Sequence, residues 1–373
     1  MEVSFKFWAI LVTTCGHGLD SFAKHLDALV IGGTGFMGRH AVQALLDAGI
    51  AVEILTDGHS ANPWGARVPE TICDRHAPCL DQKLQQKKWD LVVDFPIFAA
   101  DDAGPIIKNA KWIRHYIFPS SDDVYMVCNR TLFSFGATGG VLEESAIRPS
   151  NMSARSQLDG WDKYGDGKKR LEEMFAASTL NFTALRLPDV WGPGESTGRF
   201  ATFLRSLEQG RTIGLHITTG NPIFTTPSSG NTFRPGFVFA KDVAQMILLL
   251  LHSGPQRQPL NVAVAERPTF EETVIEAHRV LRTYKWPISN LSFAKEKEVP
   301  LLSTDIGQLD IGRARALGFI PTPWQQGWSE TIDALYNISR NESMAAEELA
   351  KCIKHCKPTC YCEPTGVTVA FVL

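Results

Sequence analysis

The chain has 373 residues, of which 44% are hydrophobic, so it can bury the core of one large domain or of two modest ones. The formal net charge of −3 excludes an overall basic field that would recruit nucleic acid or an anionic membrane. A membrane-spanning helix is also excluded, because no apolar run reaches the necessary length of about 20 residues.

Residues 1–26 precede the first predicted strand. Lys6 is followed by the apolar run 7–12 and the small residues 14–16, a pattern similar to a short signal peptide. Glu2 and the shortness of the apolar core favour a simple N-terminal extension instead. We therefore predict a cytoplasmic protein, with secretion as the alternative.

A strand, a glycine-rich turn and a helix are predicted within residues 27–46. The apolar run 28–31 is followed by three glycines, and apolar residues then recur at helical spacing in 39–46. Such glycines let the chain turn sharply and approach a pyrophosphate, which the N–H groups at the helix start would bind. An ordinary strand-to-helix turn is the alternative. The cofactor contacts predicted here are Gly32, Thr34, Gly35, Phe36, Met37 and Gly38.

The next predicted strand, 51–56, is followed by an acidic residue. Asp57 lies about 20 residues beyond the glycines, where a carboxylate can hold a ribose 2′-hydroxyl. Because a carboxylate repels a 2′-phosphate, Asp57 favours NAD over NADP as the cofactor. The alternative is a turn residue before Gly58.

Strands and helices alternate through the following segment. Strands are predicted at 69–73, 91–93 and 116–118, and helices at 80–88 and 101–109. This alternation predicts an α/β fold with a Rossmann-type doubly wound parallel sheet, because right-handed crossovers place helices on both faces. Ser120 and Ser121 follow the last of these strands, at the edge where such sheets bind ligands.

Residues 126–160 lack periodicity and are predicted to form a long surface loop. A helix at 168–177 and a strand at 182–187 follow, and the strand leads into a turn-rich segment. Beyond it we predict a smaller C-terminal mixed α/β substrate domain, in which Thr269 caps a helix. Its predicted elements are helices at 200–207, 242–251, 271–281 and from 330, strands at 237–239 and 260–264, and a loop at 221–236.

The cysteines separate into two groups. Cys15, Cys73, Cys79 and Cys128 are scattered, which predicts reduced thiols. Cys352, Cys356, Cys360 and Cys362 crowd near the end with His355, in a spacing that matches no standard zinc site, so no metal is predicted. The predicted organisation is an extension at 1–26, a Rossmann domain at 27–191, a substrate-binding part at 192–340 and a cysteine-rich, disordered tail at 341–373.

Tyr164 and Lys168 are spaced so that both side chains lie on one face of a helix. An ammonium beside a phenol lowers the phenol pKa from about 10 toward neutrality, so that the phenol can exchange a proton with a substrate hydroxyl. A hydroxyl from the pair Ser120 and Ser121 would hold the substrate oxygen. The alternative for Tyr164 and Lys168 is a packed helix face.

Four motifs occur together and in the order typical of one enzyme family. They are Gly32-Gly33-Thr34-Gly35-Phe36-Met37-Gly38, Ser120-Ser121-Asp122-Asp123-Val124-Tyr125, Tyr164-x3-Lys168 and Arg186-Leu187-Pro188-Asp189-Val190-Trp191-Gly192-Pro193. With them the chain resembles, over residues 27–337, the extended short-chain dehydrogenase/reductase superfamily. More narrowly, it resembles the NAD-dependent epimerase/dehydratase family that acts on nucleotide sugars. The resemblance implies a Rossmann domain holding NAD throughout catalysis, with Ser121, Tyr164 and Lys168 as the catalytic trio.

The resemblance implies further roles. Asp122 and Asp123 are similar to the acid pair of sugar dehydratases, which protonates the departing hydroxyl and removes the adjacent proton. We assign Asp122 to catalysis and Asp123 to the substrate, with a solvated acidic turn as the alternative. Arg234 is assigned to the substrate phosphates, although it lies eight residues before Asp242 and the family spacing is seven. The further residues assigned to the cofactor are Asp74, Phe95 and Pro188.

Two other features depart from the family pattern. The loop between Ser121 and Tyr164 is longer than in well-known epimerases. Gly165 and Gly167 each cost about 1 kcal/mol inside a helix, so the helix is predicted to begin only near Asp166. That start would displace Tyr164.

The predicted function is oxidation of a hydroxyl on a nucleotide sugar, or on another small substrate, by bound NAD. Epimerisation, elimination or simple release would follow. The alternative is a non-catalytic nucleotide-sensing or RNA-associated protein of the same superfamily. Tyr164 and Lys168 favour the enzyme, and the acidic pI of 6.4 argues against RNA. A homodimer is the expected assembly.

Overall fold

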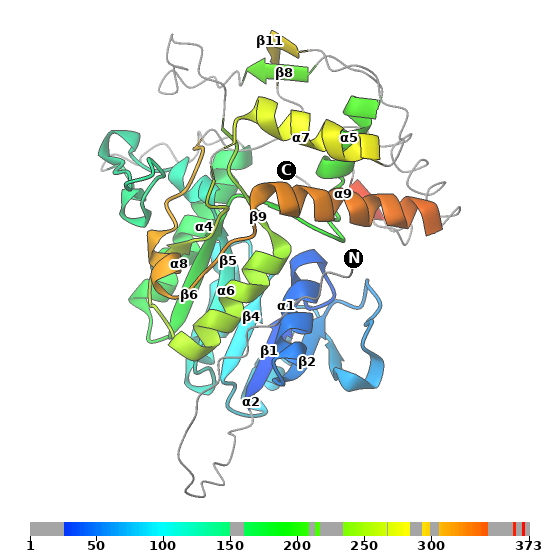
Figure 1. Cartoon of the computed structure of the whole chain (residues 1–373). Helices are drawn as coiled ribbons and strands as arrows, with labels where there is room; N and C mark the ends of the chain where they lie inside the picture. Colours follow the sequence, from blue (N-terminus) through cyan, green and yellow to red (C-terminus); the bar gives the residue numbers. More distant parts are fainter. Residues whose placement is uncertain are drawn as a thin grey trace, which may run out of the picture.

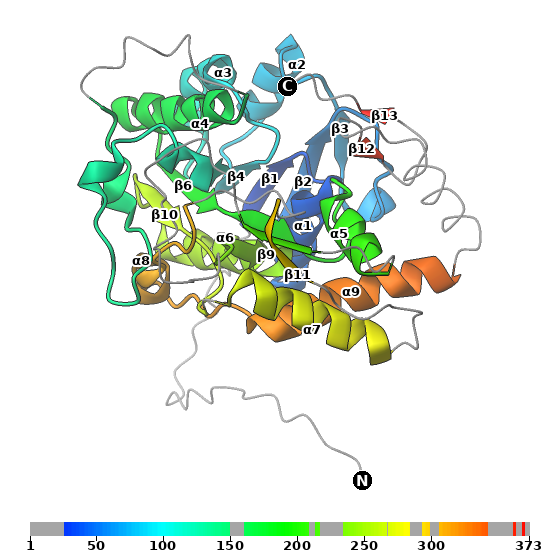
Figure 2. The ribbon, with the colours of Figure 1, turned by 90° about the horizontal axis from the view of Figure 1, so that it is seen from above.

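The computed structural model describes residues 26–149, 160–208, 213–216, 234–266, 268–283, 293–298, 306–341, 361–362 and 368–369. A seven-stranded sheet forms its centre, and a smaller group of helices lies beside one edge of that sheet (Figures 1 and 2). The predicted N-terminal extension and most of the cysteine-rich tail lie outside the described residues.

All strands of the large sheet run parallel, in the order β10-β6-β5-β4-β1-β2-β3. Their bounds are β1 Asp27–Ile31, β2 Ala51–Thr56, β3 Glu70–Ile72, β4 Leu91–Asp94, β5 Tyr116–Ser121, β6 Phe182–Leu187 and β10 Pro259–Asn261. The strand order reverses between β1 and β4, which is where sheets of this kind bind ligands at the carboxyl ends of the strands. The predicted Rossmann-type doubly wound sheet is confirmed.

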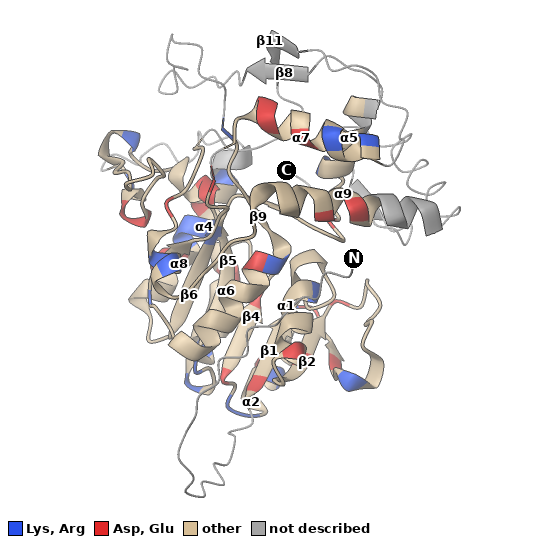
Figure 3. Cartoon of the chain, in the orientation of Figure 1, with Lys and Arg blue, Asp and Glu red and all other residues tan. Residues whose placement is uncertain are grey.

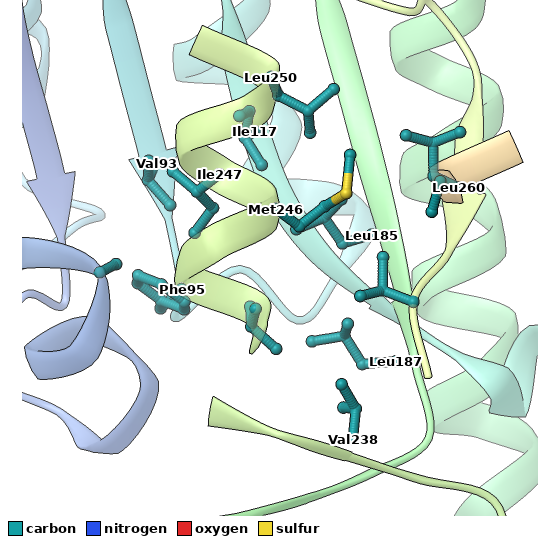
Figure 4. Packing of buried hydrophobic residues seen from close by; sticks show 14 of the residues in the cluster. Val93, Phe95, Ile117, Leu185, Leu187, Val238, Met246, Ile247, Leu250 and Leu260 are labelled. Atoms are coloured by element: carbon teal, nitrogen blue, oxygen red, sulfur yellow. The ribbon is translucent and has the colours of Figure 1, made fainter. Parts of the chain in front are cut away.

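Helices cover both faces of the sheet, because alternate residues of each strand point to opposite sides. Ala28 and Val30 of β1 face one core, and Leu29 and Ile31 face the other. The first core is covered by α1 (Phe36–Asp47) and α6 (Ala240–Ser253), and the second by α2 (Pro78–Gln85), α3 (Ala103–Lys108) and α4 (Gly160–Ala177). Figure 4 shows the α6 side chains Met246, Ile247 and Leu250 packed beside Val93, Ile117 and Leu185 of the sheet.

A third core lies in the smaller part of the molecule. It joins α5 (Arg199–Glu208), α7 (Phe270–Thr283) and α9 (Trp324–Asn341) to the parallel pair β7 (Asp189–Trp191) and β9 (Phe237–Phe239). The Trp328 ring is central to this core, with centroid distances of 4.8 Å to Phe200 and 5.8 Å to Phe237. Thr269 accepts a hydrogen bond from the Glu272 N–H at 3.1 Å, so its predicted capping role is confirmed.

The remaining elements are short. The β elements are β8 (Ile213–His216), which pairs with β11 (Phe293–Glu298), and β12 (Tyr361–Cys362), which pairs with β13 (Thr368–Val369). The helices are α8 (Gly312–Ala316) and the 3-10 turns η1 (Gly65–Arg67), η2 (Ala100–Asp102), η3 (Ala110–Trp112), η4 (Asp122–Tyr125), η5 (Arg130–Leu132) and η6 (Glu143–Ser145).

The chain returns to the large sheet beyond residue 191, the predicted end of the Rossmann domain. Strand β10 adds the last strand beside β6, with Leu260 opposite Leu185, and α6 covers the sheet. Two segments of 192–340 therefore complete the Rossmann core. Strands β6 and β10 lie far apart in the sequence, so their pairing could not be predicted from the order of the elements along the chain.

Within the described residues, part of the segment 126–149 is buried, so the prediction of a surface loop is wrong for that part, whereas residues such as Leu132 and Phe135 are exposed. Val127, Cys128 and Val141 are buried. Asn261 Nδ2 donates to the Val141 carbonyl at 2.8 Å, which ties the segment to β10. Irregular backbone can be buried here because side chains satisfy its polar groups.

Cys73 and Cys79 form a disulfide, so the prediction of reduced thiols is wrong for this pair. The turn from β3 into α2 brings the Cα atoms of the two cysteines to 6.0 Å from each other. This distance depends on β3 ending just before Cys73 and on α2 beginning just before Cys79. Cys128 is a free thiol, and burial raises its pKa to about 11.

The described helices include none that is long and apolar enough to cross a membrane. Basic and acidic residues are mixed over the elements drawn in Figure 3. Among the described residues, no three potential ligands of the types His, Cys, Asp and Glu are grouped so that they could hold a metal ion.

Candidate functional site

The predicted site residues gather at one edge of the large sheet. Gly32, Asp57 and Phe95 directly follow β1, β2 and β4, and Ser121 is the last residue of β5. Because the strands are parallel, their carboxyl ends meet at the same edge. Asp74 lies beyond β3, and Pro188 directly follows β6.

The glycine turn is built by close backbone contact. Gly32 has a φ of +75°, which glycine adopts without strain. A Cβ atom added to Gly38 would lie 2.1 Å from the Gly32 carbonyl oxygen, so only glycine lets α1 approach the turn this closely. Gly35 precedes the first helical residue, Phe36, and no side chain caps the helix. The first turn, which includes Met37, carries no acidic residue, so its N–H groups can receive an anion.

The other cofactor candidates differ in exposure. Thr34, Phe95 and Pro188 are buried, and Asp74 is exposed, with one carboxylate oxygen accepting from the His76 N–H at 2.8 Å. The carboxylate of Asp57 is 66% exposed, and one of its oxygens lies 2.9 Å from Nδ1 of His59. Partial burial opposes the effect of His59, but hydrogen bonds and charge from His59 hold the pKa of Asp57 below its ordinary value.

Arg234 differs from the candidates at the strand ends in that it directly follows no strand of the large sheet and lies just before β9. It is exposed and precedes Gly236 by two residues. A Cβ atom added to Gly236 would lie 3.1 Å from Pro188, so this segment passes close to the end of β6.

The structure brings Ser121, Tyr164 and Lys168 together. The Tyr164 phenol is hydrogen-bonded to Ser121, and the Lys168 Nζ lies 5.6 Å from the centre of the Tyr164 ring. Lys168 donates to the carbonyl oxygens of Ile97 at 2.5 Å and Pro119 at 2.8 Å, and its side chain is 1% exposed. A tyrosine, a serine hydroxyl and an ammonium arranged in this way can hold a substrate hydroxyl and exchange its proton.

Helix α4 begins at Gly160, so the predicted start near Asp166 is wrong and Tyr164 is not displaced. The two glycines of this motif serve close packing instead. A Cβ atom added to Gly165 would lie 2.2 Å from the Asp123 carbonyl oxygen, and one at Gly167 would lie 3.0 Å from the Phe98 carbonyl oxygen. The low helix propensity of glycine is therefore outweighed by the approach of α4 to η4 that its small size permits.

Asp122 and Asp123 are not a solvated turn, because they are only 3% and 5% exposed. The Ser121 hydroxyl lies 3.1 Å from a carboxylate oxygen of Asp123 and 3.4 Å from one of Asp122. Ser121 Oγ also accepts from the Asp123 N–H at 3.1 Å and so caps η4. The serine is held by its neighbours in an orientation that leaves it beside Tyr164.

The adjacent Ser120 points into a different network. Its hydroxyl donates to Glu172 at 2.7 Å, and Glu172 receives a two-pronged ion pair from Arg186 at 3.0 and 2.7 Å. Ser120 and Ser121 face opposite sides of β5, as successive strand residues do. Of the two serines, Ser121 is therefore the one that lies beside Tyr164.

Burial dominates the electrostatics of the trio. It raises the pKa of Tyr164, and the carboxylates of Asp123 and Asp122 raise it further, whereas the Ser121 hydrogen bond and Arg199 oppose them. Burial lowers the pKa of Lys168 to about 7, against the attraction of Asp94 and Asp102. The protein alone therefore keeps the phenol neutral and the lysine close to its titration midpoint at neutral pH.

The Lys168 titration should be visible in folding stability. Its folded pKa of about 7 lies below the ordinary lysine pKa of about 10.4, so the unfolded chain binds the extra proton between these values. The free energy of unfolding contributed by Lys168 should therefore rise with pH from about 7 to about 10, by at most about 1.4 kcal/mol per pH unit. Urea unfolding of wild type and Lys168→Met across this range tests the expectation. Parallel pH profiles for the two proteins would contradict it.

Sequence reasoning missed a charged cluster beside Lys168. Arg75 bonds to Asp94 through a fork of 3.0 and 3.2 Å and pairs with Asp102 at 3.2 Å. The available signal was the position of Asp94, a carboxylate that directly follows the apolar run 91–93. Asp94 is fully buried.

Residues 28–263 match the family model described as the NAD dependent epimerase/dehydratase family. No curated protein sequence matches the chain significantly. Among solved structures, a UDP-glucose 4-epimerase from Thermotoga maritima with UDP-glucose is similar at a TM-score of 0.60 and 17% identity, over 84% of this chain and 99% of that one.

Two further solved structures are similar. The enzyme WbmG of Bordetella bronchiseptica, in complex with NAD, has a TM-score of 0.61 and 17% identity over 86% of this chain and 96% of its own. A dTDP-glucose 4,6-dehydratase from Bacillus anthracis, in complex with NAD, has a TM-score of 0.60 and 16% identity over 84% and 98%. At these identities the likeness shows the fold.

Proposed function

Because this chain belongs to the NAD-dependent epimerase/dehydratase family and is an enzyme of that class, we propose that it oxidises a hydroxyl of a nucleotide sugar with bound NAD. The observation that carries the proposal is the close approach of α4 to η4, which places Tyr164 beside Ser121 with the Lys168 ammonium 5.6 Å from the centre of the Tyr164 ring. The similar epimerase that holds UDP-glucose supports the substrate class, and the similar enzymes that hold NAD support the cofactor.

The residues present fit NAD. Close packing of Gly38 on Gly32 leaves the uncapped start of α1 open to a pyrophosphate, which Gly35, Phe36 and Met37 would bind through their N–H groups. The bound cofactor would supply the hydride acceptor for the substrate carbon. Further residues proposed to hold it are Thr34, Asp57, Asp74, Phe95 and Pro188.

Ser121, Tyr164 and Lys168 have different roles in the transfer of the hydroxyl proton. Ser121 orients the substrate hydroxyl, and Tyr164 removes its proton. Tyr164 must be ionised for that step, yet burial raises its pKa, so a positive charge beside the ring is required. Lys168 supplies that charge while two backbone carbonyl oxygens hold its ammonium.

Asp122 and Asp123 extend the proposal to the step after oxidation. Both carboxylates contact Ser121 and are buried, so they lie where a departing hydroxyl could be protonated. We assign Asp122 to acid–base catalysis and Asp123 to the substrate. Elimination would require one of them, whereas epimerisation would not.

Three other expectations belong to the proposal. Arg234 would bind the substrate phosphates, since an exposed arginine can pair with them. A homodimer is the proposed assembly. A cytoplasmic location is the proposed compartment, although the Cys73–Cys79 disulfide is of a kind more common in oxidising compartments.

Mass spectrometry of the small molecules released from denatured purified protein tests the function most directly. NAD together with a nucleotide sugar is the expected result. Reduction of bound NAD by a panel of nucleotide sugars, followed at the NADH absorbance, then identifies the substrate. Protein that releases no nucleotide, and binds none in titration, would contradict the proposal.

Cofactor preference gives a separate prediction. Asp57 should make NAD bind more tightly than NADP, because its exposed carboxylate repels a 2′-phosphate. The isosteric Asp57→Asn should reduce the preference by removing the charge alone. Titration calorimetry of both proteins with both cofactors measures the ratio. Equal affinities in wild type would remove Asp57 from this role.

A further inference from the structure

The Lys168 ammonium is held by two carbonyl groups that differ in their support. Pro119 lies within β5 and pairs in register with Leu185 of β6, so the sheet places its carbonyl. Ile97 lies between β4 and η2, outside any strand. Its carbonyl, 2.5 Å from the ammonium, must be placed by contacts other than a sheet ladder.

Those contacts come from Arg75 and Asp102. Arg75 donates to the Pro96 carbonyl at 2.6 Å. One carboxylate oxygen of Asp102 accepts from the N–H groups of Phe98 at 2.8 Å and Ala99 at 2.9 Å. The backbone on both sides of the Ile97 carbonyl is therefore tied to one of these two side chains.

Arg75 also links its own contact with Pro96 to the contacts that Asp102 makes with Phe98 and Ala99. Its Nε lies 3.2 Å from Asp102, and its two terminal nitrogens bond to the two oxygens of Asp94 at 3.0 and 3.2 Å. The Tyr116 hydroxyl donates to Asp94 at 2.8 Å. Only a planar guanidinium can serve this many acceptors at once. Arg75 lies inside the ring that the Cys73–Cys79 disulfide closes.

We propose that Arg75 is a positioning residue of the active site, which holds the Ile97 carbonyl against the Lys168 ammonium through Pro96 and Asp102. The inference rests on the proposed function, because Lys168 matters only if the trio works as assigned. In the hydrogen bonds and ion pairs given above, Arg75 contacts neither Tyr164 nor Lys168 and supports Lys168 only through the backbone around Ile97. Burial lowers the pKa of Lys168, the charges of Asp94 and Asp102 oppose that fall, and the charge of Arg75 adds to it. Arg75 therefore supports Lys168 through the position of the carbonyl and not through its charge.

Arg75→Lys is the sharpest variant, because it keeps the positive charge and loses the fork. We expect kcat to fall by about a hundredfold, as a small displacement of a catalytic group can cause, with the sugar KM unchanged. The matched control is Lys83→Met, which removes another buried cation. Lys83 lies on α2, and its ammonium is 2.5 Å from the carboxylate of Glu53. The control should lose stability but keep kcat.

A second readout needs no turnover. The Lys168 midpoint can be followed by NMR in protein with 13C-labelled lysine, with the signal assigned by its loss in Lys168→Met. Loss of one carbonyl acceptor disfavours the ammonium, so Arg75→Lys should lower this midpoint and Lys83→Met should leave it unchanged. A folded Arg75→Lys with wild-type kcat and wild-type Lys168 midpoint would overturn the inference.

The two readouts separate this inference from the proposed function. If wild type oxidises no sugar but the Lys168 midpoint falls in Arg75→Lys, the function fails and the positioning role stands. If Arg75→Lys does not fold, Asp102→Asn replaces it, because asparagine keeps an oxygen for Phe98 and Ala99 but cannot pair with Arg75 as a carboxylate does. Loss of the Asp102 charge lowers the Lys168 midpoint by itself, so the readout for this variant is kcat, measured at a pH where Lys168 is protonated. The kcat should fall by about a hundredfold, and a wild-type kcat would contradict the inference.

Discussion

Tyr164→Phe should lower turnover by about 10²–10⁴-fold and leave the NAD affinity nearly unchanged, because the substitution removes only the ionisable oxygen. The ring can still pack beside Lys168, whose ammonium lies 5.6 Å from its centre. The measurement is reduction of bound NAD by the substrate identified in the sugar panel, with titration calorimetry for the cofactor.

Lys168→Met is the companion variant and should do more damage. It removes the buried positive charge that ionisation of Tyr164 needs, and we expect weaker NAD binding as well as slower turnover. Unchanged NAD reduction in Tyr164→Phe would show that another residue takes the proton. In that case the contact between Tyr164 and Ser121 would be structural.

Gly165→Ala should destabilise the protein and disable the site, although alanine is the better helix former by about 1 kcal/mol. The added Cβ would lie 2.2 Å from the carbonyl oxygen and 2.7 Å from the carbonyl carbon of Asp123, and backbone cannot move aside cheaply. Overpacking of this kind costs about 1–3 kcal/mol. The displacement of α4 from η4 should also separate Tyr164 from Ser121, with a loss of about a hundredfold in kcat.

Gly104→Ala provides the matched control. Gly104 lies in α3, and a Cβ atom added there meets no atom within 4 Å. Because Gly104 directly precedes Pro105, which disfavours helical backbone in the residue before it, no gain in stability is expected from alanine here; the control should stay within about 1 kcal/mol of wild type with kcat unchanged. Urea unfolding and steady-state kinetics of both variants decide the matter. A Gly165→Ala protein as stable and active as Gly104→Ala would refute the packing role of Gly165.

Much of the fold could be predicted because its signals are local. The apolar run before Gly32 and the helical spacing after Gly38 predict a strand and a helix, and β1 and α1 occur there. Asp57 and Ser121 could be placed at the same sheet edge from chain order alone, since each comes at the end of a parallel strand.

Two of the three failures depend on contacts between distant segments, whereas the disulfide joins residues that are only six apart in sequence. Helix propensity places the start of α4 too late, because the benefit of Gly165 comes from Asp123 on another element. The Cys73–Cys79 disulfide depends on the turn that joins β3 to α2. The buried part of 126–149 depends on Asn261, which lies on β10.

The sequence by itself determined the parallel sheet and the glycine turn and predicted that Tyr164 and Lys168 share one helix face, because periodicity, turn chemistry and residue spacing act over a few residues. Only the tertiary structure decided that Ser121 and not Ser120 meets Tyr164, and that Arg75 supports Lys168 through the backbone of Ile97. The physical reason is that burial and the pairing of buried charges set these contacts, and both depend on which segments the fold packs together.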